Sequence, residues 1–170
     1  RGGCRHVSAV GGYNGQAYSP AGEKGRFVLP PAFRKAVKES SGGSRTLCLG
    51  AHEKLDCLVG FGLSRIEKLN QRLEREEDNA VQMRDASFDR DVRAAQLFGF
   101  EQLLFDDSGR FVMPEHLRDL GKIEGALFFQ AAGEFFFVWS PDELARMGPE
   151  WKAAQAACAK LAAAAKKGAA

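Results

Sequence analysis

Two stretches of this 170-residue chain repeat one motif, EKGRFVLPPAFRKAV at residues 23–37 and DSGRFVMPEHLRDLG at residues 107–121. At an offset of 84 residues, six of the fifteen positions carry the same residue. The identical pairs are Gly25 and Gly109, Arg26 and Arg110, Phe27 and Phe111, Val28 and Val112, Pro30 and Pro114, and Arg34 and Arg118. Internal self-similarity of this kind is the signature of a duplicated structural unit. The sequence therefore predicts two copies of one small domain.

Each copy of the motif predicts a turn, then a short strand, then a short helix. Gly25 and Gly109 permit turn conformations that are closed to other residues. Pro30 and Pro114 end the strand that follows, and proline suits the first turn of a helix. We expect these helices at residues 31–38 and 115–120.

The segments that follow the two motifs correspond in apolar character. CLVGFGLSRIEKL (57–69) and FFVWSPDELARM (136–147) each read as an apolar strand, a break and an amphipathic helix. We expect strands at 46–50, 56–61, 125–131 and 134–139, and helices at 63–77 and from Ser140-Pro141 onward. The helix at 63–77 has one apolar face, made by Leu63, Ile66, Leu69 and Leu73.

The predicted elements divide the chain into five segments. These are a disordered or non-native segment at residues 1–10, a first domain at 11–83, a linker helix at 84–99, a second domain at 100–150, and an Ala/Lys-rich tail, helical or frayed, at 151–170. Within the linker, a helix is expected at 86–98, its buried side made by Phe88, Val92, Ala95, Leu97 and Phe98. Because domains of about 60–70 residues have little core of their own, we expect the two copies to pack together.

The charge of the chain is nearly balanced overall but unevenly distributed. The net charge is +2, yet residues 21–38 hold five basic residues and one acidic residue. Residues 67–91 hold five basic residues and eight acidic residues. This asymmetry favours contact with a polyanion on one face only. For the acidic stretch taken alone, we favour the solvated side of a helix. No apolar run reaches the roughly 18 residues of a membrane span, so we expect no membrane partner.

The cysteines and histidines form no recognisable catalytic or metal-binding pattern. The four cysteines, none in a C-x-x-C pair, are Cys4, Cys48, Cys57 and Cys158. We expect them to be reduced structural residues of a cytoplasmic protein. His6, His52 and His116 lie far apart, and no zinc-protease, hydrolase or phosphate-loop motif is present. We therefore expect no enzyme activity, metal, cofactor or small-molecule substrate, although a pocket lined by His52 or His116 would favour an enzyme.

The two motifs, in this order and at this separation, resemble the MraZ family, which is related to AbrB-type DNA-binding regulators. NGQAYSPAGEKGRFVLPPAFRKAV resembles the opening of such proteins, and LLFDDSGRFVMPEHLRDLG resembles their second copy. The strand-to-helix joints after each motif resemble the segments LVGFGLSRIEKL and FFFVWSPDELARM, and the family's linker helix resembles RAAQLFGF. The resemblance therefore covers residues 13–147. It implies an α+β, β-rich fold of two tandem swapped-hairpin AbrB-like β-barrel domains with short helices, related by a pseudo-two-fold axis.

The same resemblance implies a function. It implies a sequence-specific DNA-binding transcriptional regulator, a repressor that binds repeated boxes upstream of the division and cell-wall gene cluster, including its own promoter. The implied partners are double-stranded promoter DNA and further copies of the chain in a ring-shaped homo-oligomer, and the implied location is the nucleoid. The alternative that stays open is a ring-forming protein-interaction module without specific DNA binding.

The resemblance assigns DNA contacts to Lys24, Arg26 and Arg110. The planar fork of an arginine can bind guanine O6 and N7 or clamp a phosphate, and a lysine supplies a point charge for phosphate. Arg34 and Arg118 either add phosphate contacts or have a structural role.

Four further residues are expected to stabilise the motif, namely Glu23, Gly25, Asp106 and Gly109. An aspartate at the start of a turn can accept backbone N–H groups and hold the following arginine by an ion pair. The family pattern D-x-x-x-R is present as Asp106 and Arg110, but Gly22 stands where the first copy should have its Asp. Glu23 beside it could substitute in part, and whether the first copy can still bind DNA is left open.

Overall fold

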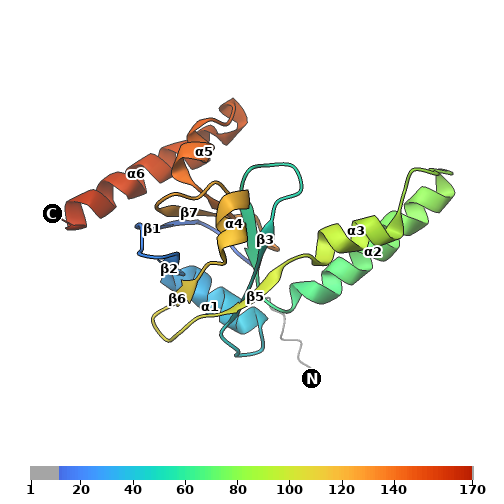
Figure 1. Cartoon of the computed structure of the whole chain (residues 1–170), viewed down its shortest axis with the longest axis horizontal. Helices are drawn as coiled ribbons and strands as arrows, with labels where there is room; N and C mark the ends of the chain where they lie inside the picture. The colour runs from blue at the N-terminus through green and yellow to red at the C-terminus, as the bar shows by residue number, and fades with distance from the viewer. Residues whose placement is uncertain (1–11, 170) are drawn as a thin grey trace, which may run out of the picture.

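The computed structural model describes residues 12–169, so the segment expected to be disordered at residues 1–10 lies outside the described residues (Figure 1). The strands are β1 (Gln16–Ser19), β2 (Arg26–Val28), β3 (Thr46–Ala51), β4 (Leu58–Phe61), β5 (Glu101–Leu104), β6 (Arg110–Val112), β7 (Leu127–Ala131) and β8 (Phe136–Trp139). The helices are α1 (Pro31–Ser40), α2 (Arg65–Gln82), α3 (Arg90–Phe98), α4 (Glu115–Leu120), α5 (Pro141–Ala145), the 3-10 helix η1 (Pro149–Trp151) and α6 (Lys152–Ala169).

Six strands form one antiparallel sheet, and the remaining two form a separate ribbon. The sheet has the order β1-β7-β8-β4-β3-β5, and β2 pairs with β6. Among the described strands, two pairings lie within one repeat, β3–β4 and β7–β8. Four pairings join one repeat to the other: β1–β7, β2–β6, β3–β5 and β4–β8. Strand pairing therefore holds the two halves of the chain together.

The arrangement is symmetric with respect to the repeat. If each strand is replaced by its counterpart in the other copy, the sheet order reads the same from its opposite end. In the ribbon, Phe27 lies opposite Phe111, so equivalent residues meet at its centre. The predicted α+β, β-rich class is confirmed, but the β-barrel domains expected from the resemblance are not closed, because in residues 12–169 the sheet is open, with β1 and β5 at its edges. Each repeat gives strands to a common sheet, which leaves neither able to close on itself.

The main core is aromatic and draws on both repeats. Phe33 of α1 lies 5.0 Å from Phe136 of β8 and 5.7 Å from Phe129 of β7, measured between ring centroids. The ring of Phe136 lies so close to Gly60 that a Cβ there would be 2.5 Å from the ring. Close packing of this kind fixes the position of α1, and with it the ribbon that precedes α1 in the chain.

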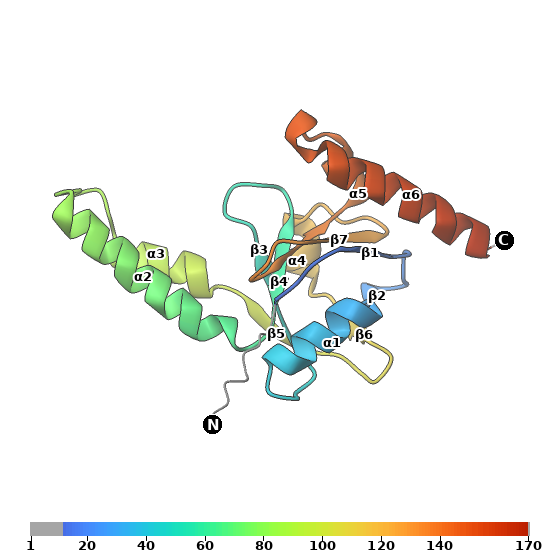
Figure 2. The same cartoon turned by 180° about the vertical axis from the view of Figure 1, so that it is seen from behind.

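Helices α2 and α3 form an arm that leaves the sheet on one side, while α5 and α6 lie on the other (Figures 1 and 2). As predicted, Leu69 and Leu73 of α2 are buried. Helix α3 begins later than expected, because Asp89 caps it by accepting the N–H groups of Asp91 and Val92.

The buried face of α3 also differs from the prediction, since Val92 and Ala95 are exposed. A charged residue takes the inner position instead. Arg93 pairs with Glu76 of α2 at 2.6 Å and with Glu53 at 2.9 Å, so this partly exposed ion-pair network joins α3 to α2 and to the loop after β3.

A second, smaller core lies beneath α6. Ala154 and Cys158 of α6 pack with Trp139 and Leu144. Cys48, Cys57 and Cys158 are free and buried, while Cys4 lies outside the described residues. Burial raises the pKa of Cys48 to about 11 and that of Cys57 to about 12, so both thiols stay protonated near neutral pH. Among the described helices, none combines the length and the apolar character that crossing a membrane requires.

The cross-repeat pairing predicts that neither half folds alone. We expect fragments 12–99 and 100–169 each to lack a cooperative unfolding transition in urea, because separation removes four strand pairings and opens the aromatic core. An equimolar mixture should regain a transition followed by circular dichroism. Cooperative unfolding of either fragment by itself would contradict this account.

Candidate nucleic-acid interface

The β2–β6 ribbon presents four side chains to solvent, which we call the ribbon face: Arg26, Val28, Arg110 and Val112. Side chains alternate between the two sides of a strand, so the central Phe27 and Phe111 point inward, where both are buried. Their rings lie 6.3 Å apart. In the antiparallel register Arg26 is opposite Val112, and Arg110 is opposite Val28. The two arginines therefore occupy one diagonal of the ribbon face and the two valines the other.

The turn before β6 is organised by Asp106. One carboxylate oxygen accepts the backbone N–H groups of Ser108 and Arg110, each at 2.9 Å, and the other accepts Nε of Arg110 at 2.7 Å. The N–H of Arg110, followed by its guanidinium, lowers the pKa of Asp106, so the carboxylate stays ionised at neutral pH. Gly109, at φ +84°, closes the turn by donating to the Asp106 carbonyl at 2.9 Å. Arg110 is 70% exposed yet held in one orientation.

The turn before β2 is built differently, one residue further along the chain. Arg26 N–H donates to the carbonyl of Glu23 at 3.0 Å, and Lys24 and Gly25 both have positive φ, +53° and +75°. Positive φ at both central residues is typical of a type I′ turn. A Cβ at Gly22 would overlap the carbonyl oxygen of Arg26, so this backbone leaves no room for an aspartate.

The first turn therefore replaces the missing carboxylate with backbone geometry. Glu23, expected to substitute in part for the aspartate, contributes its carbonyl to the turn. Within the described residues Arg26 makes no ion pair, and both Arg26 and Lys24 are exposed. The two arginines of the ribbon face thus differ, because Arg110 is oriented by a carboxylate and Arg26 is not.

Arg34 and Arg118 lie beneath the turns, each under the turn of the other repeat. Arg34 of α1 donates to the Leu29 carbonyl at 3.1 and 3.3 Å, and its Nε lies 2.5 Å from where a Cβ at Gly109 would be. Arg118 of α4 approaches Gly25 in the same way, at 2.8 Å. Both arginines are half-buried. This geometry favours the structural role over the phosphate contact.

The backbone reinforces the same reciprocal contact. Leu29 N–H donates to the carbonyl of Gly109 at 2.7 Å, and Met113 N–H donates to that of Gly25 at 2.8 Å. These hydrogen bonds extend the ribbon ladder by one residue at each end. The ribbon and both turns therefore form one stiff unit.

Arg45 is a further cation at this site that the sequence did not indicate. Its guanidinium pairs with Asp107 in the second turn at 2.6 Å. Arg45 lies just before β3, and its partner is far away in sequence, so no local pattern links the two residues. The pair offsets the negative charge of Asp107, which lies three residues before Arg110 in the chain.

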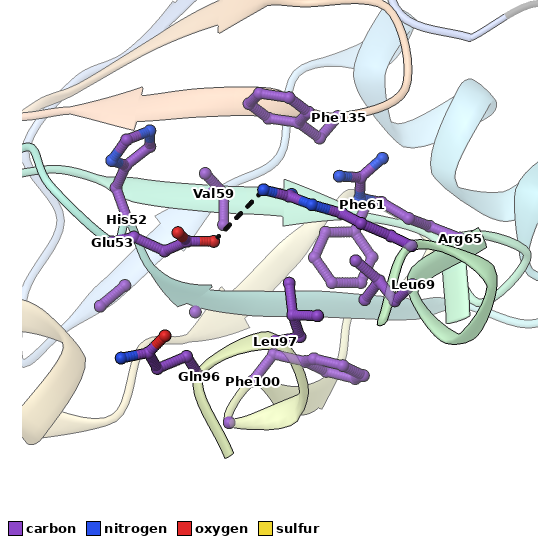
Figure 3. A pocket seen from close by; sticks show the side chains of 14 residues that line it. His52, Glu53, Val59, Phe61, Arg65, Leu69, Gln96, Leu97, Phe100 and Phe135 are labelled. Carbon is purple, nitrogen blue, oxygen red and sulfur yellow. Dashed lines mark ion pairs between the residues drawn. The ribbon is translucent and has the colours of Figure 1, made fainter. Parts of the chain in front are cut away.

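A cavity of about 110 Å³ between the sheet and the α2–α3 arm is lined by His52 and Glu53 (Figure 3). Nδ1 of His52 accepts the N–H groups of Lys54 and Leu55, both at 3.0 Å, and burial lowers its pKa, so the ring is neutral. Glu53 pairs with Arg72 and Arg93. These ionisable groups satisfy one another and present no nucleophile with a base beside it, so the cavity adds no argument for catalysis.

The other two histidines do not join His52 at this cavity in the part of the chain that the structure describes. Among residues 12–169, no group of three His, Cys, Asp or Glu side chains could hold a metal ion. His116 is exposed and lies 3.5 Å from Glu101, and His6 lies outside the described residues. The absence of catalysis and of cofactors stays a prediction.

The contact between Arg34 and Gly109 can be tested with a matched pair of glycines. Gly109 and Gly133 have nearly the same φ, +84° and +83°, but only Gly109 has close neighbours. We expect Gly133→Ala to destabilise by about 1 kcal/mol through backbone strain alone. Gly109→Ala should cost about 2–4 kcal/mol, because strain and crowding combine. Urea denaturation measures both values, and equal losses would show that the arginine contact is unimportant.

Comparison with known proteins gives relatives of one kind. A comparison with protein-family models finds none that matches. The transcriptional regulator MraZ of Parvibaculum lavamentivorans is 28% identical over 139 residues, which cover 81% of each chain. That of Rhodospirillum rubrum is 29% identical over 121 residues, 71% of this chain and 74% of the relative. That of Rickettsia bellii is 31% identical over 121 residues, 70% and 74% of the two chains. With identity at this level over so much of both chains, the protein belongs to the MraZ family.

Proposed function

We propose that this protein is a sequence-specific DNA-binding transcriptional regulator that reads the major groove with its ribbon face. The observation that carries the proposal is the pair of exposed arginines, Arg26 and Arg110, at equivalent positions of a rigid two-stranded ribbon. The major groove of B-DNA, about 12 Å wide, admits such a ribbon. The names of the relatives, transcriptional regulators, support the same function.

The ribbon geometry suits contacts to base pairs about two steps apart. Arg26 and Arg110 are diagonal neighbours, which lie about 7–8 Å apart in an antiparallel pair. Each guanidinium can bind O6 and N7 of a guanine. Lys24, exposed in the first turn, is placed to contact a phosphate, while Arg34 and Arg118 act by supporting the turns.

The regulatory role that we infer is repression. By resemblance to its family, the protein binds repeated boxes upstream of the division and cell-wall gene cluster, including its own promoter, and acts in the cytoplasm at the nucleoid. We also infer that the two repeats form a swapped-hairpin AbrB-like unit with a pseudo-two-fold axis through the ribbon. The four strand pairings between the repeats support this relation.

Two arginines alone bind weakly, so we infer that several copies act together in a ring-shaped homo-oligomer. Each bidentate base contact gives about 1–3 kcal/mol of discrimination, and linked copies on repeated boxes multiply that effect. The tip of the α2–α3 arm supports self-association, since Val81 is 72% and Met83 79% exposed. The same apolar tip supports the alternative function, a ring that binds protein partners without reading DNA.

The proposal is tested by binding to the DNA upstream of the protein's own gene across a salt series. We expect Arg26→Ala and Arg110→Ala each to weaken binding about tenfold or more, because each removes a bidentate contact. Arg146→Ala, which removes an exposed arginine directly after α5 and outside the ribbon, is the control. If the protein binds this DNA no more tightly than random duplexes at every salt concentration, the proposal of a DNA-binding regulator is refuted. The alternative, a ring that binds protein partners, would then remain.

The arm is tested by mass measurement in solution. We expect light scattering after size-exclusion chromatography to report an oligomer for the native chain and a smaller species for the double variant Val81→Ser, Met83→Ser. Removing exposed apolar side chains lowers the area available for burial at an interface. Leu120→Ser, at an exposed position of α4 outside the arm, should leave the mass unchanged. An unchanged mass for the double variant would exclude the tip as the contact.

A further inference from the structure

Within residues 12–169, the two valines of the ribbon face are partly open to solvent. Val28 is 40% and Val112 59% exposed, although each stands between charged neighbours on a face open to solvent. A β-branched residue favours a strand, but threonine would meet that requirement without exposing an apolar surface. Single exposed apolar side chains are ordinary, but these two share one face of the ribbon with two arginines, so that apolar and cationic groups are presented together.

The backbone holds both valines in fixed positions. Behind them the rings of Phe27 and Phe111 are buried, and the N–H of Val28 donates to Oγ of Ser19, itself 2% exposed, at 3.2 Å. Valine has one strongly restricted torsion, so its methyl groups also point in set directions. The ribbon face thus offers two rigid apolar contacts as well as two arginines.

The register places one valine beside each arginine. Val112 lies opposite Arg26, and Val28 lies opposite Arg110, so each cross-strand pair joins a long cation to a short apolar side chain. The two pairs are separated by two residues, about 6.7 Å along the strands, which is close to two base-pair steps. In the major groove the apolar group of a base is the C5-methyl of thymine.

We propose that Val28 and Val112 contact thymine methyl groups beside the guanines bound by Arg110 and Arg26. The proposal rests on the proposed function, since it needs the ribbon face in the major groove. It assigns to the preferred site a thymine adjacent to each contacted guanine, with the two guanine–thymine pairs related by the two-fold symmetry of the ribbon. The valines thereby add specificity that charge alone cannot supply, because phosphate contacts are the same for every sequence.

The test removes single methyl groups from DNA. Short duplexes are selected from a random pool with the full chain, and each thymine of a selected duplex is replaced in turn by uracil, which lacks only the C5-methyl. We expect a loss of about three- to fivefold in affinity at one or two positions, measured by fluorescence anisotropy, as for one buried methyl group. Val28→Ala and Val112→Ala should each weaken binding to the thymine duplex and abolish the uracil effect at one position. Val92→Ala should retain every uracil effect.

The possible results separate the two proposals. If no duplex is enriched, or if Arg26→Ala and Arg110→Ala bind as the native chain does, the proposed function fails and the inference fails with it. If the arginine variants lose binding but no uracil substitution matters to the native chain, the thymine contact alone is overturned. The uracil series needs only the native protein, so this outcome can be judged even if a valine variant does not fold. If the uracil substitutions still weaken binding in both valine-to-alanine variants, the assignment of the methyl contacts to the valines is also overturned. This holds even if the alanine variants bind more weakly because their self-association has changed.

Discussion

The antiparallel pairing of β2 with β6 is the contact on which the rest of the molecule depends. Its register sets Phe27 opposite Phe111, and this register determines which side chains of the two repeats are in contact. It turns Arg26 and Arg110 to the same exposed face and brings each turn over the arginine of the opposite helix. A slip of one residue would reverse the inward and outward faces of the slipped strand. The candidate surface therefore does not exist in one repeat taken alone.

Symmetry in the ribbon does not extend to the turns, and the difference bears on binding. In the proposed DNA complex, Arg110 would arrive already oriented by Asp106, whereas Arg26 would be immobilised on binding. Ordering a long side chain at an interface costs about 0.5–1.5 kcal/mol. Under that proposal, the arginine of the second repeat would contribute more to affinity than that of the first, and the DNA site would have two halves of similar chemistry and unequal strength.

Local sequence predicted the parts of the fold that local chemistry decides. The doubled motif predicted both ribbon strands and both proline-initiated helices, and α4 has the predicted bounds, Glu115–Leu120. The predicted helix at 63–77 is present but runs further, from Arg65 to Gln82. Strands β1 and β5, with the sequences QAYS and EQLL, were not predicted, because neither alternates apolar with polar residues. Each is a strand because a strand of the other repeat pairs with it.

In the candidate site, too, some features follow from local sequence and others depend on contacts between distant segments. Asp106, Gly109 and Arg110 form a local motif, and their geometry follows from sequence spacing alone. The support given by Arg34 to a turn of the other repeat, and the ion pair of Arg45 with Asp107, depend on how distant segments meet. No periodicity within one repeat carries that information.

This distinction also explains why the first repeat can lack its aspartate and keep its other motif residues. Asp106 acts only inside its own turn, so a turn without it can shift by one residue and close through Lys24 and Gly25. Gly25 and Gly109 have less freedom, because both have positive φ and a Cβ on either would crowd an arginine and a backbone carbonyl of the other repeat. At Gly109 these atoms are Nε of Arg34 and the carbonyl oxygen of Leu29, both at 2.5 Å. The absence of Asp at position 22 is therefore absorbed within one turn, whereas a side chain at either glycine would strain the contact that the two repeats share.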